Sequence, residues 1–440
     1  MHTICIDFGT SSIRAALRKQ DNSPAHPLAI APRSQIDNAS IPSAIFISKA
    51  GDKLFFGDKA LEAGLSRQPR LLFETSPKSW LSPANIASIP APATSDLPFS
   101  RRQLIAGLLS LSVRDSRRAA KTALGLEPDT LVYRISHPVW ISSERAQMAT
   151  EYDYLRRVAC AEIGGRVRDE MTADEFELWC KKASPDRRLP PPDVEVEEPV
   201  AAALELFPNP PINRRSAALV VDVGAGTIDL GLFISVLPDR ASRVTRKLIA
   251  MTEPRSLFGA GDEIDNALVT LVEERLGPRG SSQIAALRND IRRSKEQLFD
   301  TGNLVFRNVE ISREELVNTE KLRQMARGLK RAIDEMFSDA GARFQTQLSA
   351  SVHPIEHLDV VFAGGGANLA FLRSLVGKVV CMGKTTLSAK QAEARTPDNF
   401  EVEASRGRMA VAMGGTTFAK EWPRTEMEQP VIRSLSTPLR

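Results

Sequence analysis

Short apolar stretches that meet at polar, glycine-containing turns dominate the hydrophobic pattern of this chain. Residues 217–221 and 228–234 form one such pair, and residues 3–6 and 13–17 form a second pair with a similar turn between them. Apolar runs of about four to eight residues bounded by turn residues are typical of buried β-strands. The pattern therefore predicts two hairpins of related design, one at the start of the chain and one near its middle.

Longer segments have apolar residues at helical spacing. A further apolar stretch, residues 358–362, ends in three consecutive glycines and leads into a helical segment. This mixture of strands and helices predicts an α/β protein. Four helices are expected at residues 101–124, 144–162, 281–298 and 320–337.

Residues 166–188 are charged and helix-like, and a run of prolines at 190–192 ends this segment. Its composition differs from that of the apolar strands on either side. We therefore interpret it as an element appended to the fold, not as part of the core.

The two hairpin turns contain residues that strands disfavour. Asp7 and Asp222 follow the first strand of their hairpins, and Asp229 lies near the start of the strand after the second turn. Glycine tolerates a positive φ and lets backbone N–H groups point outward, where they can bind an anion. Carboxylates beside such amides suit a phosphate that carries hydrated Mg²⁺. Two ordinary hairpins with polar turns are the alternative.

The three consecutive glycines, Gly364 to Gly366, end the third apolar strand. A plain strand-to-helix turn does not need all of them. Glycine allows the backbone to approach a ligand closely. The run therefore predicts contact with a flat ligand such as a purine.

Composition is compatible with a large folded protein. The chain has 440 residues, of which 42% are hydrophobic, and its length predicts roughly two to four domains or subdomains. There are 58 basic and 54 acidic residues, and the formal charge is +4. No block of like charges indicates a nucleic-acid surface.

Targeting and cysteine signals are absent from the sequence. No apolar run reaches the length of roughly 20 residues that spans a bilayer, and the N-terminus does not resemble a signal peptide. The four cysteines are isolated, which indicates neither a zinc site nor a disulfide framework. A cytoplasmic location is the simplest interpretation.

The glycine-rich motifs match neither of two common nucleotide signatures, because no G-x-x-x-x-G-K-[ST] is present and no G-x-G-x-x-G follows the first strand. Their order instead resembles that of the actin-like ATPase superfamily. It most closely resembles the nucleotide-binding domain of the heat shock protein 70 chaperones, over about residues 3–418. Two phosphate motifs and one adenosine motif carry this resemblance: Ile6-Asp7-Phe8-Gly9-Thr10-Ser11-Ser12, Asp222-Val223-Gly224-Ala225-Gly226-Thr227-Ile228-Asp229 and Ala363-Gly364-Gly365-Gly366-Ala367-Asn368.

The resemblance implies an Mg²⁺-ATP site. Asp7, Asp222 and Asp229 would hold hydrated Mg²⁺. Backbone groups of the two turns would bind the β- and γ-phosphates, namely those of Gly9, Thr10, Ser11, Gly224, Ala225 and Gly226.

The resemblance also implies catalytic and adenosine-binding residues. Lys78 aligns with the lysine that positions the attacking water, although its own segment indicates a surface position. Glu198 aligns with an acid near metal and water, although an acid that complements a helix dipole would look the same. Thr227 would lie near the γ-phosphate, and Asp222 would serve both metal and catalysis. Adenosine would contact five residues, Lys295, Gly364, Gly365, Gly366 and Asn368.

By the same resemblance, the chain would form two α/β lobes with ribonuclease H-like cores and a nucleotide cleft between them. Lobe I would comprise residues 1–216, with residues 404–425 returning to it. Lobe II would comprise residues 217–403, with a helical subdomain at about 252–340. Residues 426–440 would be a C-terminal tail.

The implied function is a slow ATPase of heat shock protein 70 type that acts as a nucleotide-dependent switch for a protein partner. The insertion at about 166–193 and the tail from Lys420 are the candidate partner surfaces. No peptide-holding β-sandwich domain is expected, because few residues follow the ATPase-like region.

Several alternatives stay open. Ala225 replaces a glycine of the family pattern, and Asn368 stands where the family has an arginine. These differences favour a pseudo-ATPase that binds nucleotide with little turnover. An actin-like, self-associating filament protein uses the same ATP site. A small-molecule kinase or phosphatase would need a catalytic carboxylate facing a substrate pocket, for which the sequence offers no clear candidate.

Overall fold

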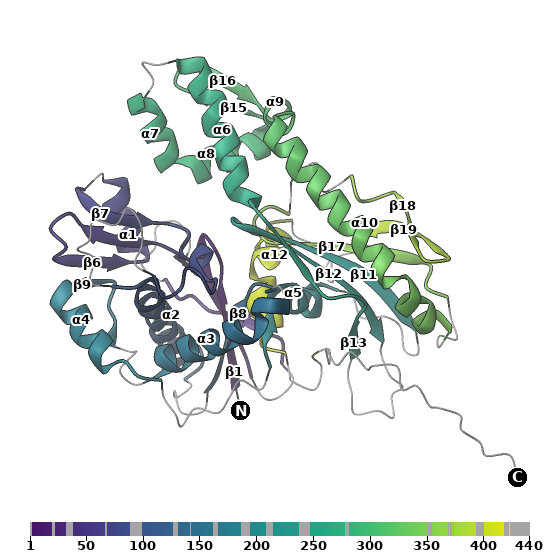
Figure 1. The fold of residues 1–440 in the computed structure, drawn as a ribbon, viewed down its shortest axis with the longest axis horizontal. Helices are drawn as coiled ribbons and strands as arrows, with labels where there is room; N and C mark the ends of the chain where they lie inside the picture. Colours follow the sequence, from purple (N-terminus) through teal and green to yellow (C-terminus); the bar gives the residue numbers. More distant parts are fainter. Residues whose placement is uncertain are drawn as a thin grey trace, which may run out of the picture.

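The structure is a computed structural model of the whole chain. It describes residues 2–19, 23–31, 38–66, 68–88, 99–125, 131–140, 142–161, 166–185, 194–207, 214–236, 247–277, 281–349, 354–367, 369, 372, 374–392, 400–417 and 422. These residues form a mixed α/β protein with two large sheets, as the alternation of strands and helices predicts (Figure 1).

The first large sheet is built around the N-terminal hairpin. Its strand order is β10-β8-β1-β2-β3, and β4 also pairs with β2. β1 is antiparallel to β2 and parallel to β8, which is parallel to β10. The strands are β1 (His2–Phe8), β2 (Ser12–Arg18), β3 (His26–Pro27), β4 (Ser40–Pro42), β8 (Leu131–His137) and β10 (Val196–Glu197).

The second large sheet is built around the central hairpin. Its strand order is β13-β12-β11-β17-β19-β18, and β14 also pairs with β12. The strands are β11 (Arg215–Val223), β12 (Thr227–Val236), β13 (Lys247–Ala250), β14 (Arg255–Phe258), β17 (His357–Ala363), β18 (Val379–Met382) and β19 (Thr385–Gln391).

Both predicted hairpins are confirmed, and the two sheets repeat one topology. In each, the first hairpin strand is antiparallel to the second and parallel to a strand from later in the chain, which has a further parallel neighbour. In the first sheet these parallel neighbours are β8 and β10, and in the second they are β17 and β19. The carboxyl ends of parallel strands share one edge of a sheet, so each turn lies beside the ends of such strands.

Two helices join the sheets. α5 (Glu198–Leu206) packs on β11 and β12, whereas α12 (Phe400–Gly414) packs on β1 and β2, and the two helices contact each other. Figure 1 shows them at the centre of the molecule. Their buried apolar side chains form one cluster with residues of both sheets, such as Cys5 and Val220. The two sheets are therefore connected through a shared core.

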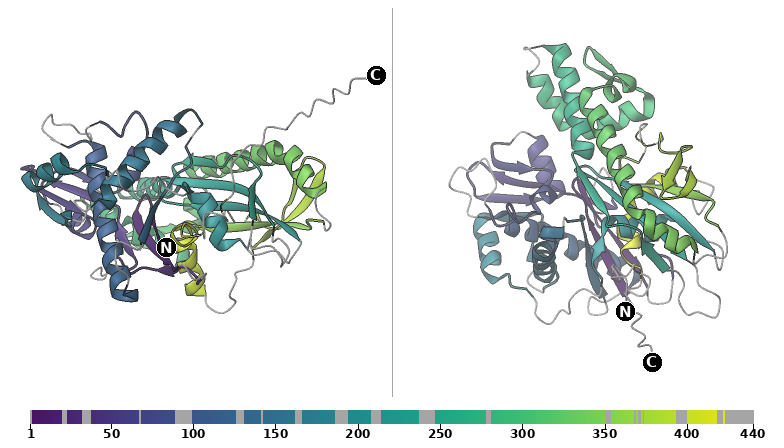
Figure 2. Two further views of the ribbon diagram at one scale, coloured as in Figure 1. Left: turned by 90° about the horizontal axis from the view of Figure 1, so that it is seen from below. Right: turned by 45° about the vertical axis from the view of Figure 1, so that its right-hand side comes forward.

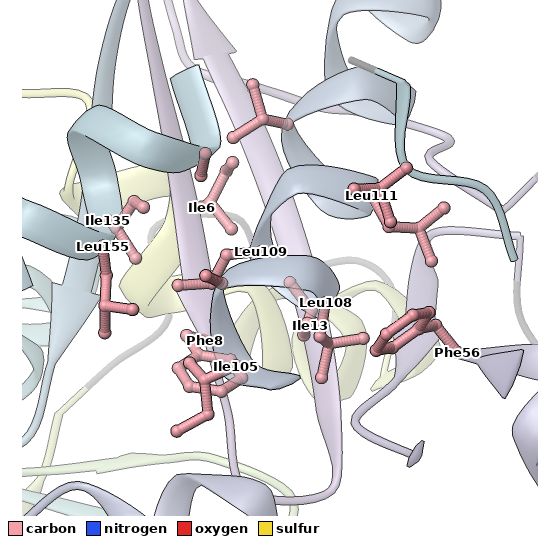
Figure 3. Close-up of a cluster of buried hydrophobic side chains, with 14 of the residues drawn as sticks. Ile6, Phe8, Ile13, Phe56, Ile105, Leu108, Leu109, Leu111, Ile135 and Leu155 are labelled. Atoms are coloured by element: carbon pink, nitrogen blue, oxygen red, sulfur yellow. The ribbon is translucent and has the colours of Figure 1, made fainter. Parts of the chain in front are cut away.

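The other face of the first sheet is covered by α2 (Arg101–Leu124) and α3 (Ser142–Cys160). Figure 3 shows side chains of β1, β2 and β8 that meet those of α2 and α3, among them Ile6, Ile105 and Leu155. The bounds of α2 match its predicted range. Ser100 begins the helix with a capping box to Gln103.

The segment predicted as an appended helix belongs to the core, so that interpretation was wrong. It contains β9 (Glu170–Thr172) followed by α4 (Ala173–Lys182), and residues 186–193 lie outside the described part. β9 pairs with β6 (Lys53–Phe56), in a sheet with β5 (Ile45–Ser48) and β7 (Arg70–Glu74). The charged residues of the segment 166–185 lie on its solvent-facing side.

Phe176 and Trp179 of α4 are buried. The ring of Phe176 lies 5.5 Å from that of Phe56 and 5.0 Å from that of Phe99, between ring centroids. α1 (Asp58–Leu65) packs on β5 and β6 of the same small sheet.

A group of helices follows the second hairpin. It contains α6 (Ala260–Leu276), α7 (Ser281–Asn289), α8 (Ile291–Thr301), β15 (Asn303–Phe306), β16 (Val309–Ser312), α9 (Arg313–Val317) and α10 (Glu320–Ser349). Both views in Figure 2 keep α10 on the side of the molecule away from the four-stranded sheet.

The prediction of a single helix at 281–298 was wrong, because the helix is interrupted at Asp290 and forms α7 and α8. The backbone of Asp290 leaves the helical region, with φ −113° and ψ 19°. Aspartate is a weak helix former, and the break lets α7 and α8 both contact α6. Within the ranges given above, no helix is both long and apolar enough to cross a bilayer.

Candidate functional site

The turns of the two hairpins lie against each other. A Cβ atom placed on Gly226 would come within 3.0 Å of the Thr10 side chain. Turn residues 9–11 and 224–226 are therefore neighbours, although they are far apart in the chain. The backbone amides of Thr10, Ser11, Ala225 and Gly226 donate no hydrogen bond to any described residue.

Four carboxylates and one ammonium group surround these turns. Asp7 is the last residue but one of β1, Asp222 and Asp229 form a directly opposed pair on β11 and β12, and Glu198 begins α5. Lys78 reaches them from η1 (Pro77–Trp80). All five side chains are buried.

Lys78 is buried, contrary to the surface position that its segment indicates. Its Nζ lies 2.5 Å from Oε1 and 2.7 Å from Oε2 of Glu198. Burial lowers the pKa of Lys78, but the carboxylates of Glu198, Asp229 and Asp7 outweigh this effect and raise it, so the ammonium stays charged.

Burial shifts the carboxylates toward their neutral forms. It raises the pKa of Glu198 to about 7, against the opposing effect of Lys78. The pKa of Asp222 lies well above its usual range because of burial and three neighbouring carboxylates. Burial also raises the pKa of Asp7. Four acids face one lysine in this buried cluster, so all of them can be ionised together only beside a further cation.

The carboxylates differ in their hydrogen bonds. Asp229 accepts one from Thr227 at 2.7 Å between Oγ1 and Oδ2, and one from Ser256 of β14. Asp7 accepts one from Ser136 of β8, with 3.2 Å between Oγ and Oδ1. Asp222 accepts none from the described residues. Among the three aspartates, its carboxyl group therefore has the least hydrogen-bond support from the described residues.

The glycine run after β17 packs against the central hairpin. Gly364 has φ 79°, and a Cβ there would come within 2.4 Å of Asp222 Oδ1, so a side chain is not tolerated. The Gly366 amide donates to the Val223 carbonyl at 3.0 Å. Gly365 is exposed. Asn368 lies outside the described residues.

Lys295 is separate from the carboxylate cluster. Its Nζ forms an ion pair with Asp265 of α6 at 2.6 Å and lies 3.4 Å from the Gly261 carbonyl oxygen. Gly261 packs against Ala225 of the second turn. Lys295 therefore contacts α6, and α6 lies between Lys295 and the second turn.

The acids of the cluster offer oxygen atoms, the type of donor that Mg²⁺ prefers. Among the described residues, no three acidic, histidine or cysteine side chains are placed to hold one metal ion together. Mg²⁺ usually keeps several waters and takes one or two carboxylates plus substrate phosphates. Asp7, Asp222 and Asp229 are hard oxygen donors of this kind.

Sequence reasoning missed two serines at the site. Ser136 and Ser256 each donate to a carboxylate of the cluster, from strands outside the two hairpins. A small hydroxyl residue in an otherwise apolar strand, close to the strand end, is the signal that indicates Ser136.

Comparisons with known proteins assign no family. No protein-family model matches the chain, and the search of curated proteins finds no match. The resemblance to the actin-like ATPases therefore stays a prediction that rests on the motifs.

Proposed function

We propose that this protein is an Mg²⁺-dependent ATPase of actin-like, heat shock protein 70 type that acts as a nucleotide-dependent switch. In this proposal the two large sheets are the cores of its two lobes. ATP would bind between the two hairpin turns.

The observation that carries the proposal is the gathering of four buried acids, with one lysine, beside the two turns. Asp222 and Asp229 lie directly opposite each other across two strands, and like charges at such positions destabilise a sheet. Burying unpaired charge costs still more. A divalent cation beside these acids would remove the cost.

The free amides support an anionic ligand beside that cation. Four backbone amides of the two hairpin turns donate a hydrogen bond to no described residue; they are those of Thr10, Ser11, Ala225 and Gly226. Neighbouring free amides form a site for phosphate oxygens. Cation and phosphate would then neutralise each other at the place where the two turns meet.

Lys78 and Glu198 suit the activation of water. Bound Mg²⁺ would neutralise phosphate charge during transfer. Glu198, with a pKa near 7, can accept a proton from a water at neutral pH. The charged Lys78, held by both oxygens of Glu198, would orient that water. Thr227 would donate to a phosphate oxygen in exchange for its bond to Asp229.

The switch would arise because ATP contacts both turns, and each turn belongs to a different sheet. A ligand that binds one arrangement of the sheets better than another shifts the population toward it. The partner would be a protein, with the segment at about 166–193 and the C-terminal tail as the candidate surfaces.

Asp222→Asn tests the site. This isosteric change removes one of the two opposed carboxyl groups that would face the cation, so we expect Mg²⁺-ATP affinity, measured by isothermal titration calorimetry, to fall at least about tenfold. Asp359→Asn is the matched control, because Asp359 is a buried aspartate of β17 that is already paired with His357 at 3.3 Å. The control is expected to keep wild-type affinity. Absence of Mg²⁺-ATP binding by the wild-type chain would refute the proposal, as would equal affinity of the two variants.

A further inference from the structure

Ser136 occupies the middle of the site without belonging to any motif. It lies near the end of β8, between β1, which carries Asp7, and β10, which leads into Glu198. Its side chain is fully buried. Its Oγ lies 3.2 Å from Asp7 Oδ1 and 3.4 Å from Glu198 Oε1.

The other contacts of Ser136 restrict its hydroxyl hydrogen to the side of the two carboxylates. The Phe8 amide donates to Oγ at 3.2 Å, which occupies the acceptor side of the hydroxyl. The Tyr152 hydroxyl donates to the Ser136 carbonyl at 2.8 Å and so anchors the backbone. A serine has one hydroxyl hydrogen. That hydrogen is left to point at the two carboxylates, and it can serve only one of them at a time.

We propose that Ser136 is a positioning residue that holds Asp7, on the metal side, and Glu198, on the water side, in a fixed relation to each other. When Asp7 is engaged by a cation, the hydroxyl can turn to Glu198 and keep it facing Lys78. The inference rests on the proposed function, because the proposed function places Asp7 beside the metal and Glu198 beside the water.

The hydroxyl matters because the surroundings are strongly charged. Asp7 and Glu198 repel each other when both are ionised in this buried environment, and a neutral donor between them stabilises the carboxylate to which it donates. The charged groups that act on Asp7 come from several elements; the cations attract its carboxylate and the other acids repel it. These groups are Arg14 of β2, Lys78 of η1, Glu198 of α5, Asp222 of β11 and Asp229 of β12.

The test compares Ser136→Ala with Ser136→Thr and Ser110→Ala. Ser110 is a matched control: it is equally buried, but it lies on α2 and donates only to the Ala106 carbonyl at 2.7 Å. Thermal unfolding checks that every variant is folded. Single-turnover ATP hydrolysis by the full chain gives the rate, and calorimetric titration with Mg²⁺-ATP gives the affinity.

We expect Ser136→Ala to slow single turnover by about ten- to a hundredfold, because small misplacements of reacting groups have effects of that size. Affinity should change by less than about threefold. Ser136→Thr, which keeps the hydroxyl, should recover most of the rate, and Ser110→Ala should retain it. A rate loss that Ser110→Ala shares, or that Ser136→Thr does not restore despite folding, would overturn the inference.

A crystal structure of Ser136→Ala separates this inference from the proposed function. If the wild-type chain fails to bind Mg²⁺-ATP, the proposed function is wrong, but the positioning role is still measurable. We expect the Asp7 or Glu198 carboxylate to rotate away from its wild-type position in the variant. Unchanged positions of both carboxylates, with the Lys78 contacts intact, would overturn the positioning role.

Discussion

Burial shifts the pKa values of two side chains beside Ser136 in opposite directions. It raises the pKa of Glu198 to about 7 and lowers that of the neighbouring His137 to about 4. Both shifts favour the neutral form, as expected where charge is poorly solvated. The positive charges of Lys78 and Arg145 add to the effect on His137. The surroundings of the carboxylate cluster thus admit little additional charge.

His137 is held as a neutral ring. It stacks on Trp140 with 4.2 Å between ring centroids, and its Nδ1 donates to the Pro138 carbonyl at 2.9 Å, since a carbonyl can only accept. Protonation would place a charge between Trp140 and the site. The folded state therefore resists taking up this proton.

His137→Phe should make stability less sensitive to acid. The unfolded chain binds a proton at His137 near pH 6.5, but the folded chain binds it only near pH 4, so the wild type loses stability as pH falls through this window. The loss from this group is about 3 kcal/mol. Urea unfolding at several pH values from 4.5 to 7.5, in steps of about one unit, measures it.

Phenylalanine keeps the stacking and cannot titrate, so the difference between variant and wild type should shift in favour of the variant as pH falls. His26→Phe, at an exposed position of β3, is the control and should follow the wild type. Parallel pH curves for wild type and His137→Phe would contradict the expectation.

Among the elements, α4 shows how a charged segment can contribute to a core. Its helical repeat places Phe176 and Trp179 on one face, where Phe176 packs against Phe56 and Phe99 and Trp179 stacks on Phe176. The opposite face carries acids, lysines and the half-exposed Leu178. A single apolar face is enough to attach a helix that is charged on average.

Phe176→Ala should lower the free energy of unfolding by about 3–5 kcal/mol, because it removes a fully buried aromatic ring and leaves a cavity. Leu178→Ala, on the same helix at 52% exposure, should change it by less than about 0.5 kcal/mol. Urea unfolding of both variants measures the difference. Similar small effects of the two substitutions would show that α4 is only peripherally attached.

At the scale of the whole molecule, the contact between α5 and α12 determines how the two large sheets are joined. A Cβ on Gly414 would come within 1.8 Å of the Ala201 carbonyl oxygen. No side chain fits there, because the neighbouring atom is backbone and has no flexible end to move. The close approach of the two helices therefore depends on this glycine.

Gly414→Ala should destabilise the protein by about 3 kcal/mol or more, since it forces the two helices apart. Gly407→Ala is the matched control on the same helix, because a Cβ there would meet no described atom within 4 Å. It should stabilise slightly, by about 0.5–1 kcal/mol, through helix propensity. Thermal and urea unfolding of both variants measure this contrast, and equal stability of the two would show that the contact is not tight.

The sequence indicated those elements whose signals are local. Both hairpins, the strand before Gly364 and the bounds of α2 follow from apolar runs, turn residues and caps within each segment. The break at Asp290 and the strand β9 could not be predicted in this way. They depend on contacts with α6 and β6, which no nearby residue indicates.

For the candidate site, the sequence by itself determined which acids and glycines stand at the strand ends, because a hairpin turn has its own residue preferences. Only the tertiary structure decided that Lys78 is buried against Glu198, 120 residues away in the chain. It likewise decided that Ser136 lies between two carboxylates and that Lys295 pairs with Asp265. The reason is physical: a short-range pattern sets the backbone of a turn, whereas the surroundings of a charge depend on which distant strands end beside it.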